Sequence, residues 1–144
     1  KNIDENIKVL DSDSSQFSWL SPGVRNPDFP NNYIQHIKDN IGLVDIILVS
    51  THKIVRDALI DNKIKFVLAF PSINLLDEYL ERFKKRGSDE AFLNLLKTNW
   101  RNWIEEVLDC VLKENGKVFG WILRQGEYLS DVLPLILKMT NQAL

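Results

Sequence analysis

The feature that most constrains the fold is a set of four short apolar runs separated by segments with helical periodicity. The runs cover residues 7–10, 44–49, 64–70 and 118–123. The second and third are almost continuously apolar and rich in β-branched residues, a composition typical of parallel strands that are covered on both faces. We therefore predict four strands, with 44–49 and 64–70 as interior strands of a mainly parallel sheet.

Around these runs, apolar residues recur three and four positions apart, which predicts amphipathic helices. The expected helices cover residues 32–40, 51–62, 72–85, 88–96, 100–114 and 129–140. Strands that alternate with helices are typical of right-handed βαβ units, so we expect a three-layer α/β/α architecture. A length of 144 residues suits a single domain. Residues 18–32 carry three prolines and a glycine and are expected to form a loop.

Composition narrows the class of partner. The formal net charge is −2 and the isoelectric point is near 5.7, so no overall positive field favours nucleic acid or an anionic membrane. The apolar runs are far shorter than the ~20 residues that span a bilayer. The single cysteine, Cys110, lies in an apolar run and is expected to be a buried core thiol. These observations favour a soluble, cytoplasmic protein.

Polar residues follow the first two predicted strands, at the edge where open α/β sheets bind their ligands. Asp11 and Asp13 end the first run, and Ser50 and His52 follow the second, with Arg56 one turn into the next helix. Carboxylates at positions i and i+2 of an extended chain point to the same side, so both can face one ligand. They suit Mg²⁺ or the acceptance of a hydroxyl proton. The competing interpretation is an Asx-turn that starts a loop.

A cationic run closes the helix predicted at 72–85. Arg82 and Arg86 lie four residues apart on one helical face and could bind one polyphosphate together. Because the helix dipole alone favours basic residues in the last turn, a solvated charged face is the competing interpretation. His52 also has two interpretations: it could orient a substrate, or it could be a hydrogen-bonded polar residue at the end of a strand.

The tryptophans divide into two groups. Trp103 and Trp121 lie in amphipathic or strand patterns and are expected in the core. Trp19 lies in the proline-rich segment, where it either stacks on a base or anchors the loop, and Trp100 suits either role.

Taken in order, these segments resemble the small P-loop nucleotide and metabolite kinases, and among them the short kinase-like proteins of bacteriophages. The order is a strand ending in Asp-x-Asp, a strand ending in Ser-x-His, and a helix closing with Glu-Arg-x-x-x-Arg-Gly. The stretches that carry the resemblance are 9–15, 25–30 and 126–132.

The resemblance implies ATP and Mg²⁺ as cofactors and a helical lid at about 72–101. Asp11 and Asp13 would lie near Mg²⁺ and the phosphoryl acceptor, with Asp11 binding the ion through water. The substrate-binding residues would be Arg25, Ser50, His52 and Arg56. The phosphate-binding residues would be Arg82, Arg86 and Arg101.

The chain departs from this family at one point. No G-x-x-x-x-G-K-[ST] sequence occurs in the 144 residues, and that loop supplies the backbone donors and the lysine that hold the β- and γ-phosphates. The family's first strand, which lies centrally between the second and third strands predicted above, would be missing with it. We expect the strands to re-pair, to recruit a partner chain, or to be completed by an upstream segment, and the start at Lys1 rather than methionine favours the last.

Three functional hypotheses follow. In the first, the parent protein transfers a phosphoryl group to a nucleotide or small hydroxylated substrate, and this chain is its acceptor and lid portion. In the second, the chain is a non-catalytic interaction or inhibitor protein on a degenerate kinase scaffold. The third, a nucleic-acid end-processing kinase, is disfavoured by the acidic isoelectric point.

Overall fold

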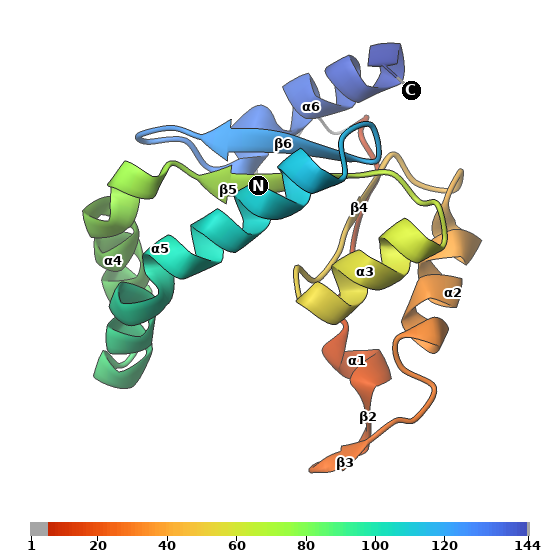
Figure 1. Ribbon diagram of the computed structural model, residues 1–144, viewed down its shortest axis with the longest axis horizontal. Coiled ribbons are helices and arrows are strands. Elements are labelled where there is room, and N and C mark those ends of the chain that lie inside the picture. The colour runs from red at the N-terminus through yellow and green to blue at the C-terminus, as the bar shows by residue number, and fades with distance from the viewer. Residues whose placement is uncertain (1–5, 144) are drawn as a thin grey trace. The chain divides into compact units, whose positions relative to one another are not determined.

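The computed structural model describes residues 6–143 and shows a mixed α/β protein with parallel strand pairs (Figure 1). The chain divides into two compact units. The first runs to Lys65 and includes the segment from Leu133 onward, and the second is Phe66–Val132. Within the described part of the chain, no helix combines the length and apolar character needed to cross a membrane.

The first unit is built on a parallel strand pair. β1 (Val9–Asp11) pairs with β4 (Ile46–Leu48), with Val9 opposite Ile46 and Asp11 opposite Leu48. The helices of this unit are α1 (Ser15–Ser18), α2 (Asn31–Asn40) and α3 (Lys53–Asp61). A short antiparallel hairpin, β2 (Trp19–Ser21) and β3 (Val24–Arg25), follows α1.

The core of the first unit comes from the apolar faces of α2 and α3. Tyr33 and Val55 are fully buried, and Leu59 is 1% exposed. Tyr33, Ile34 and Ile37 fall on one face of α2 because they are one and four residues apart. The helix ends before Gly42, whose φ of +91° is a left-handed conformation that suits glycine.

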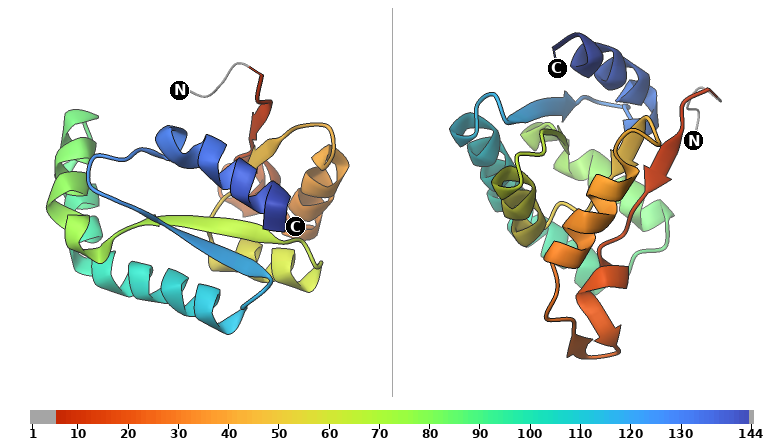
Figure 2. Two further views of the ribbon diagram at one scale, coloured as in Figure 1. Left: turned by 90° about the horizontal axis from the view of Figure 1, so that it is seen from above. Right: turned by 90° about the vertical axis from the view of Figure 1, so that its right-hand side faces the viewer.

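The second unit is built on a longer parallel pair. β5 (Phe66–Pro71) pairs with β6 (Val118–Leu123) along all six residues. η1 (Ile73–Leu75) leads into α4 (Leu76–Lys85), and α5 (Glu90–Lys113) packs against α4 and against both strands. Figure 2 shows α5 running along the β5–β6 pair. α6 (Leu129–Ala143) starts in this unit and continues into the first.

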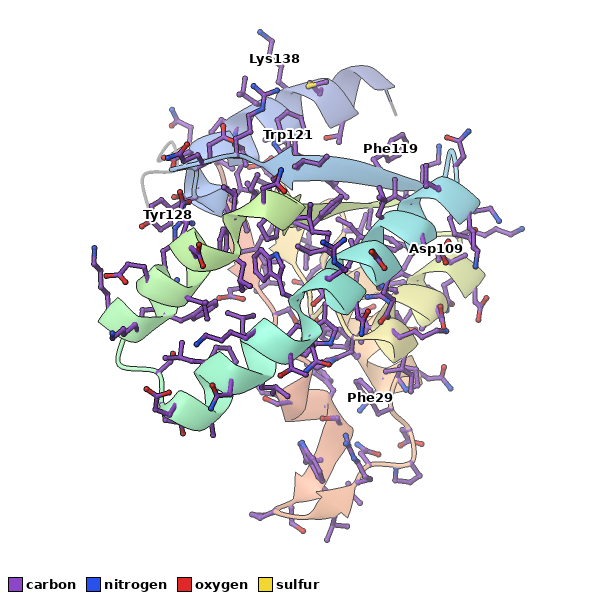
Figure 3. The ribbon with its side chains drawn as sticks, turned by 60° about the vertical axis from the view of Figure 1, so that its left-hand side comes forward. Phe29, Asp109, Phe119, Trp121, Tyr128 and Lys138 are labelled. Carbon is purple, nitrogen blue, oxygen red and sulfur yellow. The ribbon has the colours of Figure 1, made fainter. Side chains whose placement is uncertain are left out.

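One glycine fixes how closely α5 approaches β6. A Cβ atom at Gly120 would lie 3.1 Å from Cγ1 of Val111 on α5 and 3.6 Å from the ring of Phe70. The helix therefore packs directly over the backbone of β6 at this position. Two aromatic side chains of the same strand, Phe119 and Trp121, are half-buried (Figure 3).

All four predicted strands are present. The helices predicted at 32–40 and 51–62 lie within two residues of their predicted bounds, whereas the one predicted at 72–85 starts at Leu76 after η1 and the one predicted at 129–140 continues to Ala143. The helices predicted at 88–96 and 100–114 are one continuous helix, α5. The residues between them contain no helix breaker, and Thr98 and Asn99 turn their side chains back to the carbonyl groups of Asn94 and Leu95 at 2.9 Å. The loop predicted at 18–32 contains the β2–β3 hairpin.

The single continuous sheet predicted from the sequence is not observed. Among residues 6–143, β4 pairs only with β1 and β5 pairs only with β6, so neither is flanked by strands on both sides. β4 is half-buried along its length, whereas β5 buries Leu68 and Phe70. The structure thus shows parallel strand pairs with helices, and not a three-layer P-loop kinase fold.

Of the two tryptophans predicted in the core, Trp121 is half-buried and Trp103 is exposed. Trp103 is 41% exposed, so its assignment to the core was wrong: it lies at the margin of the buried face of α5, which Trp100 and Ile104 occupy. Trp100 is buried, and its indole N–H donates to the carbonyl of Ile73 at 2.8 Å. Cys110 is half-buried rather than fully buried.

Candidate functional site

The polar loops that follow β1 and β4 are bound together. The backbone N–H of Ser14 donates to the Ser50 hydroxyl at 3.1 Å, and the N–H of Ser12 donates to the carbonyl of Leu48 at 2.9 Å. Parallel strands carry their carboxyl ends to one edge of a sheet, which is why loops 36 residues apart in sequence meet here. The sequence places both loops at the carboxyl ends of strands, and the structure shows them hydrogen-bonded to each other.

A buried tyrosine holds the two loops in register. The hydroxyl of Tyr33, on α2, donates to the carbonyl of Ser12 at 2.7 Å and accepts the N–H of Ser50 at 3.2 Å. Its ring lies among aromatic neighbours, with the Phe17 centroid at 5.3 Å and the Phe29 centroid at 6.2 Å. Tyr33 therefore fixes the positions of both loops, a role that sequence patterning did not reveal.

Asp13 forms the turn that was the competing interpretation of the Asp-x-Asp pair. Its Oδ1 accepts the backbone N–H of Ser15 at 2.9 Å, and its Oδ2 accepts the Ser15 hydroxyl at 2.8 Å. These two hydrogen bonds, the backbone one first, lower the pKa of the Asp13 carboxyl, and the nearby His52 lowers it further. Asp13 and His52 are thus electrostatic neighbours, and both are exposed.

The carboxylate of Asp11 differs from that of Asp13 in its hydrogen bonding. It is exposed at the end of β1, and no hydrogen bond or ion pair involves its carboxylate in residues 6–143. In the same part of the chain, no group of three or more His, Cys, Asp or Glu side chains is arranged to hold a metal ion. A Mg²⁺ ion at Asp11 would therefore take most of its ligands from water and substrate phosphates, as Mg²⁺ often does in proteins.

The predicted substrate-binding arginines have other surroundings. Arg56 is 6% exposed, and its Nη1 donates to the carbonyl of Thr51 at 2.9 Å. Arg25 lies in the β2–β3 hairpin, with its guanidinium carbon 4.0 Å from the ring centroid of Trp19. The structure thus brings Asp13, His52 and Ser50 together, whereas Arg56 supports the strand-end backbone and Arg25 stacks within the hairpin.

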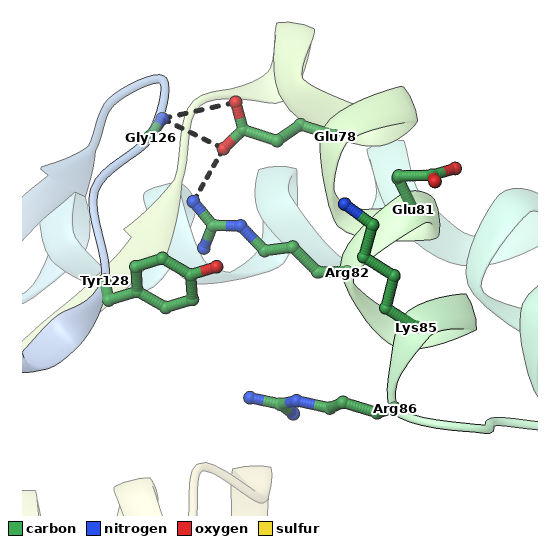
Figure 4. Close-up of a pocket in the computed structure, with 7 residues that line it drawn as sticks. All are labelled: Glu78, Glu81, Arg82, Lys85, Arg86, Gly126 and Tyr128. Atoms are coloured by element: carbon green, nitrogen blue, oxygen red, sulfur yellow. Dashed lines mark hydrogen bonds and ion pairs between the residues drawn. The ribbon is translucent and has the colours of Figure 1, made fainter.

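A separate cavity of about 460 Å³ lies in the second unit and contains Arg82 and Arg86, two of the three arginines predicted to bind phosphate. It lies between α4 and the loop that joins β6 to α6 (Figure 4). Its lining residues are Glu78, Glu81, Arg82, Lys85, Arg86, Gly126 and Tyr128. Sequence reasoning gave no role to Glu78, Gly126 or Tyr128, although the Glu78–Arg82 spacing of four residues is typical of a helical ion pair.

Arg82 makes an ion pair, a hydrogen bond and two aromatic contacts in this cavity. It pairs with Glu78 at 2.7 Å and donates to the carbonyl of Glu127 at 3.0 Å. Its guanidinium carbon lies 4.6 Å from the ring centroid of Tyr79 and 4.0 Å from that of Tyr128. Burial raises the pKa of the Tyr79 phenol, and the adjacent Arg82 guanidinium offsets part of that rise.

The other predicted phosphate ligands are more accessible. Arg86 is exposed and lies over the ring of Phe83 at 5.3 Å. Lys85, which was not among the predicted ligands, is also exposed and is the last residue of α4. Arg101 lines neither this cavity nor the smaller one of about 330 Å³ between α4 and α5. Its guanidinium pairs with Glu105 at 3.6 Å on the surface of α5. The cavity thus contains Arg82, Lys85 and Arg86 but not Arg101.

No protein-family model, curated protein or solved structure matches this chain.

Proposed function

We propose that this chain is the acceptor and lid portion of a P-loop kinase-like phosphotransferase, acting on a nucleotide or a small hydroxylated substrate. The observation that carries the proposal is the pairing of the strands. The four parallel strands form β1–β4 and β5–β6 pairs, and these are the pairs that would flank a central first strand in the kinase arrangement. We propose that the protein has the three-layer P-loop kinase fold once that central strand is present.

The hydrogen-bond pattern shows which backbone groups remain available on β4 and β5. Phe66 donates to Lys117, and Ser72, just beyond the strand, donates to Leu123, so even-numbered residues of β5 face β6. Since neighbouring residues of a strand point in opposite directions, the amides of Val67 and Ala69 face the open edge. On β4, Ile46 donates to Lys8, which leaves the amide of Ile47 on the open side. Each edge can therefore accept one more strand.

The acceptor side of the proposed reaction centres on Asp11. Asp13 is occupied by Ser15, so its role is to shape the loop. Asp11 has an exposed carboxylate at the carboxyl end of β1, which suits it to accept the proton of the attacking hydroxyl. Mg²⁺, when bound with ATP, would neutralise charge on the transferring phosphoryl group, and Asp11 is the residue that would hold it through water.

The proposed phosphate-binding site of the second unit is the α4 cavity. Arg82 lies on α4 and Arg86 follows the last residue of that helix, one turn later, and Lys85 adds a third cation to the same lining. Guanidinium groups bind phosphate oxygens through two parallel N–H donors, which suits this cavity to a polyphosphate.

The test adds a strand, a Walker A loop and its helix ahead of Lys1. We expect the 144-residue chain alone to bind Mg-ATP weakly and to transfer no phosphoryl group, because side-chain cations cannot replace a preorganised ring of backbone donors. The extended protein is expected to bind Mg-ATP in calorimetry. In it, Asp11→Asn should abolish transfer but keep most of the ATP affinity, whereas Asp61→Asn, an exposed control in the same unit, should change neither.

The alternative is a non-catalytic interaction protein on the same scaffold. One set of observations favours it: Asp13, Arg56 and Arg82, three of the residues assigned to the site, already make hydrogen bonds within the chain. An extended protein that binds Mg-ATP no better than the 144 residues would support this alternative and refute the kinase proposal.

A further inference from the structure

The α4 cavity already contains an anionic group of the protein itself, the carboxylate of Glu78. Its Oε2 accepts a hydrogen bond from Arg82 at 2.7 Å and from the backbone N–H of Gly126 at 3.1 Å. Its Oε1 lies 3.2 Å from the same N–H (Figure 4). A guanidinium and a backbone N–H that converge on one oxygen are the donors with which proteins bind phosphate.

These donors do not depend on Glu78 for their positions. The Arg82 guanidinium contacts the rings of both Tyr79 and Tyr128 and donates to the carbonyl of Glu127. Gly126 lies in a turn with φ of +75°, where the N–H of Glu127 donates to the carbonyl of Arg124 at 3.1 Å. Both donors are therefore preorganised for an anion other than Glu78.

The cavity has room and charge for a larger anion than a carboxylate. Its volume is about 460 Å³, and Lys85 and Arg86 line it from the next turn of α4. Figure 4 shows both side chains extending from α4 on the side that carries Arg82. A phosphate group on the Arg82 and Gly126 donors would place further phosphates of a linear chain within reach of these two cations.

We propose that this cavity binds a linear polyphosphate group and that Glu78 is a built-in competitor, which occupies the Arg82 and Gly126 donors until a phosphate replaces it. The inference rests on the proposed function for the identity of the natural ligand, and it adds a mechanism that limits binding. A phosphate and the Glu78 carboxylate cannot share these donors, because two negative charges a few ångströms apart repel strongly where water is partly excluded. Binding therefore requires the Glu78 side chain to move away.

The test is calorimetric titration of the 144-residue chain with inorganic tripolyphosphate at low salt. Glu78→Gln keeps the size of the side chain but removes its charge, so we expect it to raise the affinity roughly tenfold. Glu81→Gln is the matched control, since Glu81 lines the same cavity but makes no hydrogen bond or ion pair among the residues that the structure describes. We expect the affinity of this control for tripolyphosphate to rise at most about twofold, because removing one exposed negative charge only slightly weakens the repulsion of the anion.

Two readouts keep the inference falsifiable if Glu78→Gln folds poorly. In the unmodified chain, tripolyphosphate should shift the NMR signal of the Gly126 amide, because that N–H exchanges one acceptor for another. Lys85→Gln with Arg86→Gln should weaken binding without shifting the thermal unfolding midpoint, because both side chains are exposed. An unchanged Gly126 signal at saturating tripolyphosphate would refute the exchange.

The outcomes separate this inference from the proposed function. If the unmodified chain binds tripolyphosphate and Glu78→Gln binds it no more tightly than Glu81→Gln, the competitor role is wrong while the phosphate site stands. If neither the unmodified chain nor Glu78→Gln binds tripolyphosphate, the cavity is not a phosphate site, and that part of the proposed function fails as well.

Discussion

Replacing Tyr33 with phenylalanine removes one hydroxyl group from beneath the candidate site and leaves the aromatic packing in place. That hydroxyl donates to the carbonyl of Ser12 at 2.7 Å and accepts the N–H of Ser50 at 3.2 Å, and the Tyr33 side chain is fully buried. A typical intramolecular hydrogen bond contributes about 1 kcal/mol net, and a buried group left without a partner costs ~1–3 kcal/mol. Because the second bond is longer and only part-buried, we expect a total loss of roughly 2 kcal/mol.

Urea denaturation followed by circular dichroism measures this loss as a lower unfolding midpoint at constant slope. The thermal midpoint should fall by roughly 6 °C. Tyr128→Phe is the matched control, because Tyr128 is exposed and its hydroxyl makes no hydrogen bond among residues 6–143. A Tyr33→Phe protein within about 0.5 kcal/mol of the unmodified chain would refute the reasoning that this hydroxyl joins the two strand ends.

Two other predictions test the packing of the second unit and the electrostatics of the first. Gly120→Val should destabilise the second unit by about 1–3 kcal/mol in urea denaturation, because a Cβ at this position lies 3.1 Å from Val111. Gly120→Ala should cost less. A valine variant as stable as the unmodified chain would contradict the close approach of α5. The lowered pKa of Asp13 means that its contribution to stability is present above the pKa of the unfolded state and is lost as the pH falls through the lower folded-state pKa. Ser15→Ala removes the hydroxyl that donates to Asp13 and keeps the backbone N–H, so it should raise the Asp13 pKa by part of the shift in an NMR titration. An unchanged titration midpoint would show that the Ser15 hydroxyl does not lower the pKa.

The elements of the fold could be predicted because their signals are local. The apolar runs that became β4 and β5 and the spacing of Tyr33, Ile34 and Ile37 on α2 each depend on residues that are close in sequence. Strand pairing is a contact between segments that are far apart in sequence, and local patterns in the sequence do not show which strand, if any, pairs with the open edges of β4 and β5. The same limit explains Trp103, since a residue at the margin of a helical face follows the periodicity of the buried face without being covered.

The candidate site could be predicted only in part. Proximity of the loops after β1 and β4 follows from parallel topology, so the sequence could predict that Asp13, Ser50 and His52 lie near one another. The orientation of individual side chains does not follow from topology. A sequence pattern cannot show that Arg56 turns to the carbonyl of Thr51 or that Glu78 occupies the donors of the α4 cavity, because each depends on loop conformations formed only in the folded chain.

Amide hydrogen exchange is the most direct test of the claim that β4 and β5 flank a missing central strand. The amides of Ile47, Val67 and Ala69 face the open edges, so they should exchange quickly in the 144-residue chain, whereas that of Leu68, which faces β6, should be protected. In the protein extended by a strand and a Walker A loop, we predict that the three open-edge amides become protected and that Mg-ATP protects them further. Fast exchange of all three in an extended protein that is folded would contradict the account, because the added strand would then pair with neither edge.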